Sequence, residues 1–260
     1  MNKLQTMIDS HAHLDFADFD TDRGQLLQQM HRSGISNVII PSVSEAQWDN
    51  QISIALQHNC FYALGIHPWH CEEASKTTLA TLRQMLQKYA GKQGLVAVGE
   101  CGLDKLHKSN FATQMILFEG QIALAKEFDL PLIIHAVRAH EDVLRCLNNQ
   151  DVRRKGVIHG FYGGPQLAAQ YVKLGYKLGV GGLLLNDNAP KLQQTVAELP
   201  LESFILETDS PAMTPKNSLN SRNTPLILPE VLQKMADLQK KSTVLVSEQM
   251  FYNVAQLFDL

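Results

Sequence analysis

The sequence lacks three features that would narrow its function at once: a long apolar run, an excess of basic charge, and closely spaced cysteines. No stretch approaches the roughly 20 apolar residues that a membrane-spanning helix needs. The N-terminus carries Lys3, but no apolar segment of the kind found in secretory signals precedes Asp9. We therefore expect a cytoplasmic protein without a membrane partner.

The charge balance and the cysteines exclude further classes. Lys and Arg number 23 against 26 Asp and Glu, which gives a net charge of -3. A protein that grips long duplex nucleic acid is expected to carry a basic face, so local contacts must hold any polyanionic substrate. The four cysteines form no C-x-x-C pair, which argues against a zinc ribbon or a disulfide framework, and we interpret them as reduced thiols. They are Cys60, Cys71, Cys101 and Cys146.

The sequence does contain a regular alternation of short β-type apolar runs with longer helical patterns, as in successive βα units. Helices are predicted over 22–33, 79–89 and 113–128, and further helical patterns cover 229–238 and 242–258. Eight alternations in 260 residues predict an α/β fold, a (β/α)8 TIM barrel forming a single domain over residues 1–260 with extra C-terminal helices. The eight predicted strands are 6–11, 37–43, 60–66, 94–99, 130–135, 155–159, 176–180 and 203–207.

Six side chains of the types that bind metal ions fall at or near the C-terminal ends of these strands. In a (β/α)8 barrel the active site lies at that end, so the fold would bring all six together. A single His in an apolar strand is more often a hydrogen-bonded core residue, but six in register favour a metal site. The mixed set of imidazoles and carboxylates admits zinc, magnesium or manganese without choosing between them. The six are His11, His13, Glu100, His135, His159 and Asp209.

Neighbouring residues have weaker assignments. Asp9 and Asp15 flank the two N-terminal imidazoles and could orient their N–H groups, although Asp15 could equally cap a helix. Glu207 lies two residues before Asp209 on the same face and could support it. Cys101 should turn away from Glu100 into the core. His31, His58 and His107 fall in helical or loop contexts and need no functional role.

Six motifs in fixed order resemble the TatD family of metal-dependent hydrolases, a branch of the amidohydrolase-like barrels. The resemblance runs nearly from end to end, and the HGF form of one motif with the glycine-rich run 179–182 is similar to a less characterised hydrolase subgroup. The motifs are DSHAHLD (9–15), GIHP (65–68), GECGLD (99–104), PLIIH (131–135), HGFYG (159–163) and ETDSP (207–211).

The resemblance implies a centre that holds two divalent metal ions, with Glu100 as the bridging ligand. His11, His13 and Asp209 would complete one ion, and His135 with His159 the other. Such ions make a water more acidic and stabilise the entering and leaving oxygens of a phosphoryl displacement, so no covalent nucleophile is needed. Asp209 is our choice for the group that accepts the proton of that water.

The substrate contacts are less well defined. The family often has an Arg two residues after the fifth-strand His, whereas this chain has Val137 there and Arg138 next. Arg138 could bind phosphate, or be a surface residue that opens a helix. Arg222 matches the family's Arg-Asn-x-Pro segment, with an ordinary loop residue as the alternative. His67 and His70 would contact substrate from the rim, or be surface histidines.

Three functions remain open on the sequence. The favoured one is a metal-dependent phosphodiesterase, a deoxyribonuclease that acts on nucleic acid ends in the 3′–5′ direction, because TatD-like proteins include such enzymes. Its substrate would be single-stranded nucleic acid or a small phosphodiester, and the protein a monomer. The second is hydrolysis of a carboxylic ester, lactone or amide, including D-aminoacyl-tRNA. The third is a non-catalytic metal-binding barrel, against which the presence of all six ligand types argues.

Overall fold

The computed structural model describes residues 6–75, 77–92, 94–150, 152–216, 218 and 221–260. Eight strands in this part of the chain form one sheet whose order follows the sequence from β1 to β8. The strand pairs in each compact unit are parallel, and helices alternate with the strands. This is the topology of a (β/α)8 barrel, as predicted. The chain forms two compact units, residues 1–40 with 160–260, and residues 41–159.

The first unit contains both ends of the described chain. In it β1 pairs with β2, and β7 pairs with β8. Beyond the ends of β1 and β8, Ala12 and Ser210 form an isolated parallel bridge. Its elements are β1 (Met7–Asp9), η1 (Ala17–Phe19), α1 (Arg23–Arg32), β2 (Ile35–Pro41), α6 (Pro165–Lys173), β7 (Lys177–Val180), η5 (Gly182–Leu185), α7 (Pro190–Glu198), η6 (Leu201–Ser203), β8 (Phe204–Leu206), η7 (Pro225–Ile227), α8 (Leu228–Gln239) and α9 (Thr243–Phe258).

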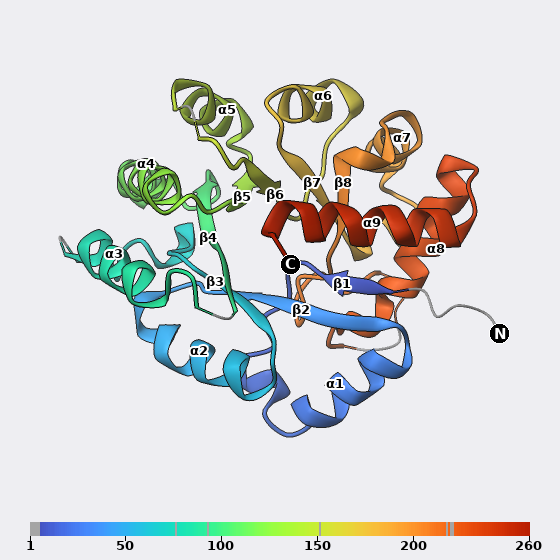
Figure 1. Ribbon diagram of the computed structural model, residues 1–260. Coiled ribbons are helices and arrows are strands. Elements are labelled where there is room, and N and C mark those ends of the chain that lie inside the picture. Colours follow the sequence, from blue (N-terminus) through green and yellow to red (C-terminus); the bar gives the residue numbers. More distant parts are fainter. Residues whose placement is uncertain (1–5, 76, 93, 151, 217, 219–220) are drawn as a thin grey trace. The chain divides into compact units, whose positions relative to one another are not determined.

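The second unit holds the central part of the chain. Strands β3 to β6 pair in sequence order, and Figure 1 shows helices α3, α4 and α5 on one side of them. Its elements are η2 (Glu45–Gln47), α2 (Trp48–Gln57), β3 (Phe61–Leu64), η3 (Pro68–His70), α3 (Thr78–Tyr89), β4 (Leu95–Asp104), η4 (Lys108–Asn110), α4 (Phe111–Phe128), β5 (Leu132–Val137), α5 (His140–Asn149) and β6 (Gly156–Ile158).

The apolar faces of the helices and the strand interiors form the core. On α4, Phe118 and Ile122 are fully buried while Ile116 is exposed, as the helical spacing of the apolar residues predicts. Strands β1, β6 and β8 are buried along their whole length, as expected for parallel strands that are covered by helices. Cys101 is buried, and its Sγ lies 3.5 Å from the carbonyl oxygen of Ile133, which confirms its place in the core.

Strand β4 extends five residues beyond its predicted end and places two acidic side chains that matter below. The predicted strand ends at Gly99, and Gly102 three residues later is of a type that often marks a turn. Gly102 is required for pairing instead, because a Cβ there would lie 2.0 Å from the carbonyl oxygen of His135. The register shifts between Val98 and Cys101, after which β4 continues beside β5 to Asp104. Glu100 therefore lies within the strand and Asp104 at its end.

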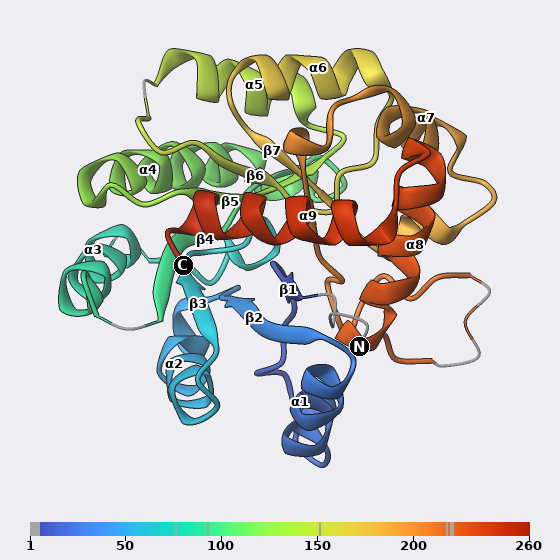
Figure 2. The ribbon, with the colours of Figure 1, turned by 45° about the vertical axis from the view of Figure 1, so that its right-hand side comes forward.

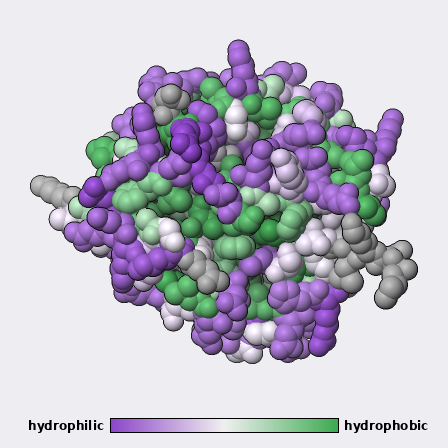
Figure 3. All heavy atoms as spheres, in the orientation of Figure 1, coloured by the Kyte–Doolittle hydropathy of each residue, from purple (hydrophilic) through white to green (hydrophobic). Residues whose placement is uncertain are grey.

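Helix α9 covers the amino ends of β1 and β8. Asn253 donates to the carbonyl oxygen of Phe204 at 2.7 Å, and Ser247 donates to that of Thr6 at 3.2 Å. Figures 1 and 2 show α9 beside α8 and β1. Phe251 and Tyr252 of α9 are exposed, and Figure 3 shows apolar side chains among polar ones on the face where α9 lies in Figure 1. No helix in the described ranges is long and apolar enough to cross a membrane.

Candidate metal centre

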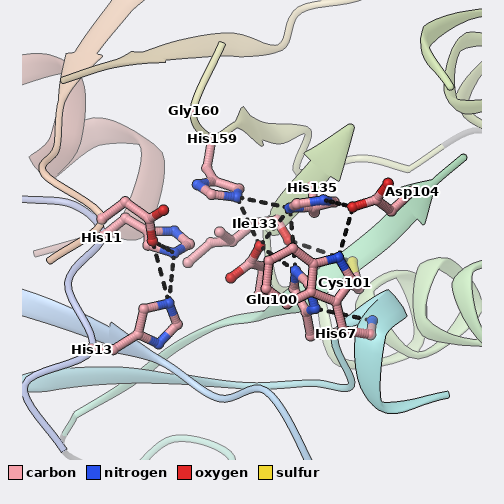
Figure 4. A network of polar contacts seen from close by, with 12 residues as sticks. His11, His13, His67, Glu100, Cys101, Asp104, Ile133, His135, His159 and Gly160 are labelled. Carbon is pink, nitrogen blue, oxygen red and sulfur yellow. Dashed lines mark hydrogen bonds and ion pairs between the residues drawn. The ribbon is translucent and has the colours of Figure 1, made fainter. Parts of the chain in front are cut away.

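Three side chains converge where β1 and β8 end. His11 Nε2 lies 3.3 Å from His13 Nε2, and Asp209 Oδ1 lies 3.4 Å from each of these nitrogens. Figure 4 shows the two imidazoles turned toward one another. His11 is completely buried, whereas the Asp209 side chain is 16% exposed. We call His11, His13 and Asp209 the β1/β8 group.

Backbone contacts between the two strand ends hold this group together. The amide of Asp209 donates to the carbonyl oxygen of His11 at 2.8 Å, and that of His13 donates to the carbonyl oxygen of Ser210 at 2.7 Å. Asp209 has a left-handed backbone with φ of 56°, which Asp tolerates better than most residues. The chain therefore turns sharply at Asp209 and presents its carboxylate beside the imidazoles.

Asp9 joins the same two strand ends from inside the core. Its carboxylate accepts hydrogen bonds from the Thr208 hydroxyl at 2.6 Å, the Thr208 amide at 3.1 Å and the His11 amide at 3.1 Å. These partners differ from the imidazole N–H groups that we expected for Asp9. Burial outweighs these bonds and raises the pKa of Asp9 to about 7. Asp9 therefore positions the backbone that carries the β1/β8 group.

The Glu207 side chain lies in a buried space that exists only because nearby residues are glycines. Its carboxylate is buried and accepts a hydrogen bond from the amide of Gly160. A Cβ on Gly179 would lie 2.1 Å from Glu207 Oε2, so only glycine leaves room for this side chain. Burial raises the pKa of Glu207 to about 8. Packing against Glu207 therefore explains why the run 179–182 begins with glycine within β7.

A second set of side chains converges on β3 to β6. Glu100 Oε1 lies 2.7 Å from His159 Nε2, 3.1 Å from His135 Nδ1 and 3.2 Å from His67 Nε2. His135 Nδ1 also lies 3.2 Å from His67 Nε2 and 3.3 Å from His159 Nε2. Figure 4 shows the four side chains around one point. We call His67, Glu100, His135 and His159 the β3–β6 group.

Asp104 fixes the orientation of His135. Its Oδ2 lies 3.1 Å from His135 Nε2 and accepts a hydrogen bond from Trp69 Nε1 at 2.7 Å, while Oδ1 accepts from the amide of Leu106 at 2.8 Å. A carboxylate that receives one imidazole N–H leaves the other nitrogen available to an ion. Sequence reasoning missed this role, although Asp104 is the last residue of the GECGLD motif.

Burial and neighbouring carboxylates together set the pKa values in this group. Burial alone would raise the pKa of Asp104, but the hydrogen bonds from His135 and Trp69 lower it to about 2. Burial would lower the pKa of His135, but Asp104 and Glu100 raise it to about 9. Burial lowers the pKa of His67 to about 4, despite the neighbouring Glu100. Without an ion, His135 therefore holds a proton at neutral pH, whereas His67 does not.

Both groups suit a divalent cation. Imidazole nitrogens and a carboxylate oxygen within hydrogen-bond distance of one another can direct their lone pairs at a single cation once any proton between them is displaced. Two sets meet this description within single units: His11, His13 and Asp209, and His67, Glu100 and His135. In each set nitrogen and carboxylate oxygen donors are mixed, which fits zinc or manganese well and magnesium less well.

Comparison with known proteins decides the family. A family model described as TatD related DNase matches residues 8–259. The chain belongs to the TatD family. Among curated TatD-like relatives, the uncharacterized metal-dependent hydrolase YjjV of Escherichia coli K12 is 35% identical over 255 residues, which cover 97% of this chain and 98% of that protein. A 3′-5′ ssDNA/RNA exonuclease TatD of Pantoea ananatis is 29% identical over 263 residues, covering 98% and 100%.

Solved structures agree with the sequence comparisons. The crystal structure of YjjV, a TatD homologue from Escherichia coli K12, has a TM-score of 0.94 and 33% identity, and covers 99% of this chain and all of its own. A TatD family hydrolase from Entamoeba histolytica has a TM-score of 0.84 at 21% identity, over 99% of each chain, and shows the fold alone. The predicted family and fold are confirmed, and the protein is a metal-dependent hydrolase of the TatD family.

The structure distributes the six predicted ligands of this TatD protein between the two groups. His11, His13 and Asp209 form one, and Glu100, His135 and His159 lie in the other. His67, predicted to contact substrate, lies inside the β3–β6 group beside Glu100. The sharing of Glu100 between two ions and the contact of His67 with substrate stay predictions, and burial of His67 contradicts the alternative of a surface histidine.

The remaining predicted substrate contacts are not members of either group, although the His70 ring centroid lies 6.5 Å from that of His67. His70 Nδ1 lies 2.8 Å from Glu73 Oε1 at the end of η3. Arg138 is exposed, one residue after β5, with a left-handed backbone of φ 53°. Arg222 pairs with Asp22 at 2.6 Å and 3.0 Å through both terminal nitrogens, and its guanidinium carbon lies 4.6 Å from the centre of the Phe19 ring. These contacts favour the alternative that Arg222 is an ordinary loop residue and does not bind substrate.

Proposed function

We propose that this TatD protein is a metal-dependent phosphodiesterase that removes nucleotides from the 3′ end of single-stranded nucleic acid. The observation that carries the proposal is the presence of two sets of side chains that could each hold a metal ion, His11 with His13 and Asp209, and His67 with Glu100 and His135, of which only Asp209 is partly exposed. Support also comes from relatives named 3′-5′ ssDNA/RNA exonuclease, at 29% and 30% identity. We further propose that the whole chain is one catalytic domain that acts as a monomer.

The side chains of the site have two roles in this proposal, metal binding and proton transfer. Two divalent ions, zinc, magnesium or manganese, would be held by His11, His13 and Asp209 and by the β3–β6 group. When bound, they supply the Lewis acidity that makes a water more acidic and stabilises charge on phosphate oxygens. Asp209 is the ligand with 16% side-chain exposure, compared with 3% for Glu100. It is therefore the carboxylate best placed to take the proton of an attacking water.

The charge of the chain fits action at an end. A net charge of -3 provides no general attraction for a long polyanion. A terminal phosphodiester needs few contacts, which the ions and one or two cationic side chains such as Arg138 can make. The proposal therefore predicts weak dependence of binding on strand length beyond the few terminal nucleotides.

The experiment compares three substrates with one preparation. Protein stripped with a chelator is reconstituted with zinc, magnesium or manganese and offered a 3′-single-stranded oligonucleotide, a small carboxylic ester and an amide. We expect removal of the 3′ nucleotides from the oligonucleotide only, complete loss of activity on chelation, and recovery when the ion is restored. Activity on the ester or amide alone would replace the phosphodiesterase with the second candidate. No turnover of any substrate, with ions demonstrably bound, would favour the non-catalytic alternative.

A further inference from the structure

Trp69 is an exposed aromatic side chain beside the β3–β6 group. It is one of two tryptophans in the sequence. Trp48 is 2% exposed, whereas Trp69 is 55% exposed although its ring is large and apolar. Burial of such a ring is normally favourable, so a tryptophan held in solvent at the edge of a metal-binding group suggests a ligand contact.

The indole is held in one orientation. Its Nε1 donates to Asp104 Oδ2 at 2.7 Å, and the backbone amide of Trp69 donates to His67 Nδ1 at 3.1 Å. The indole and the His67 ring meet edge to face, with centroids 5.0 Å apart and planes at 87°. Because Nε1, the only polar atom of the indole, is bonded to Asp104, the exposed part of the ring is apolar and is held in a fixed orientation for a ligand.

A second ring extends this surface. His107, for which the sequence indicated no role, has its ring centroid 5.3 Å from that of Trp69 with planes at 39°. His107 is exposed and lies in the loop between β4 and η4, and Asp104 orders that loop through the Leu106 amide. Trp69 and His107 together form a short aromatic surface, which we call the Trp69 platform.

The platform is linked to the metal-binding group through one carboxylate. Asp104 Oδ2 contacts both Trp69 Nε1 and His135 Nε2, and the Trp69 and His135 rings have centroids 6.2 Å apart. A flat group stacked on Trp69 would therefore lie next to the position where the β3–β6 group holds its ion. In a nucleotide, a flat base is joined through one sugar to the phosphate.

We propose that the Trp69 platform stacks a nucleobase of the single-stranded substrate and so sets the substrate class of the site. This inference rests on the proposed phosphodiesterase function and deepens it. Stacking on an aromatic side chain accepts every base because each has a π face, so it provides affinity without sequence preference. It also explains how a chain with a net charge of -3 can hold a nucleic acid end.

The two tryptophans provide a direct measurement of binding. The indole of Trp69 contacts solvent while Trp48 is buried, so quenching of the exposed emission reports stacking at Trp69. The probe is a short oligothymidylate with phosphorothioate linkages that resist hydrolysis, and the control probe has the same backbone with abasic sites. We expect saturable quenching by the first probe and none by the abasic one.

The variants are Trp69→Leu and, as a matched control, Tyr252→Leu. Tyr252 is 57% exposed and lies on α9, which covers the amino ends of β1 and β8. Anisotropy of a labelled oligothymidylate should show binding weakened roughly 5-fold to 100-fold in Trp69→Leu and unchanged in Tyr252→Leu. Trp69→Phe, which keeps a flat ring but loses the bond to Asp104, should retain most of the affinity.

Kinetics separate stacking from a structural role. With hydrolysable oligonucleotides, Trp69→Leu should have a higher KM for the base-containing strand than the parent and than Trp69→Phe, which loses the same bond to Asp104. The two variants should have the same kcat and the same KM for the abasic strand. Equal KM for parent and Trp69→Leu on the base-containing strand would overturn the inference while the proposed function stands. Absence of hydrolysis of either strand by the parent would refute the function instead, and base-dependent quenching at Trp69 would then still support the platform.

Discussion

The substitution Asp104→Asn tests whether a carboxylate outside the ligand set controls ion binding. Asp104 Oδ2 lies 3.1 Å from His135 Nε2, and its partners leave His135 Nδ1 directed at Glu100. Asn has nearly the same shape but no charge. Loss of an orienting carboxylate typically weakens metal affinity about 10-fold to 100-fold, or about 1.4 to 2.7 kcal/mol. We expect that loss in the affinity of the β3–β6 group.

The size of the defect should depend on pH. Asp104 and Glu100 raise the pKa of His135 to about 9, so at pH 7 an ion must displace a proton from the parent protein. Removing this proton two pH units below the pKa of His135 costs roughly 3 kcal/mol. In Asp104→Asn the pKa of His135 falls and this cost decreases. At pH 7 the loss of ligand orientation weakens metal binding, while the lower cost of removing the His135 proton strengthens it. The full loss of metal affinity therefore appears only near pH 9.

The same shift affects the stability of the protein without an ion. The raised pKa of His135 in the folded state means that its contribution to stability is fully present below the unfolded value of about 6.5. That contribution is lost as the pH rises through about 9. The Tm of chelator-treated parent should therefore decrease over this window through His135. The decrease should be smaller in Asp104→Asn.

The assay is zinc competition with a chromophoric chelator at pH 7 and pH 9, combined with calorimetry in two buffers to count released protons. The control is Asp142→Asn on α5, whose carboxylate pairs with Lys105 at 2.5 Å and Arg145 at 2.6 Å. This control should bind zinc as the parent does. If Asp104→Asn, correctly folded, equals the parent in affinity and proton release at both pH values, Asp104 does not orient a ligand and the reasoning fails.

Three other predictions concern the ligands and a predicted substrate contact. Asp209→Asn should lower turnover by roughly 10² to 10⁴ with folding intact and substrate affinity much less changed; near-parental turnover would leave Glu207 as the next candidate for the proton acceptor. Glu100→Ala should lose ion binding in the β3–β6 group and nearly all activity, whereas His58→Ala should stay within about an order of magnitude of the parent, and equal losses would contradict the assignment of the strand-end site. Arg222→Ala should lower the free energy of unfolding by at most about 1 kcal/mol, because its pair with Asp22 is partly exposed, and should leave KM unchanged; a large increase in KM would restore Arg222 as an anion contact.

Several features could be predicted from the sequence because they depend on local patterns. Apolar runs of strand length between helical repeats predicted all eight strands of the sheet, since short-range spacing decides which faces can be buried. The same spacing predicted the buried face of α4 around Phe118. Motifs such as ETDSP identified the family because their residues are close in sequence. The convergence of His11, His13 and Asp209 also followed, because parallel strands bring their carboxyl ends to one edge.

Other features required contacts between residues far apart in the chain, which spacing alone cannot reveal. The extension of β4 to Asp104 depends on pairing with β5, where only glycine at 102 permits the close approach of His135. The place of His67 beside Glu100 and the pairing of Arg222 with Asp22 depend on how separate elements pack. The link from Trp69 through Asp104 to His135 joins residues from three elements. Sequence patterns decide which faces are buried, but only the tertiary structure decides which buried polar groups meet, because each buried donor or acceptor takes the partner that packing brings within reach.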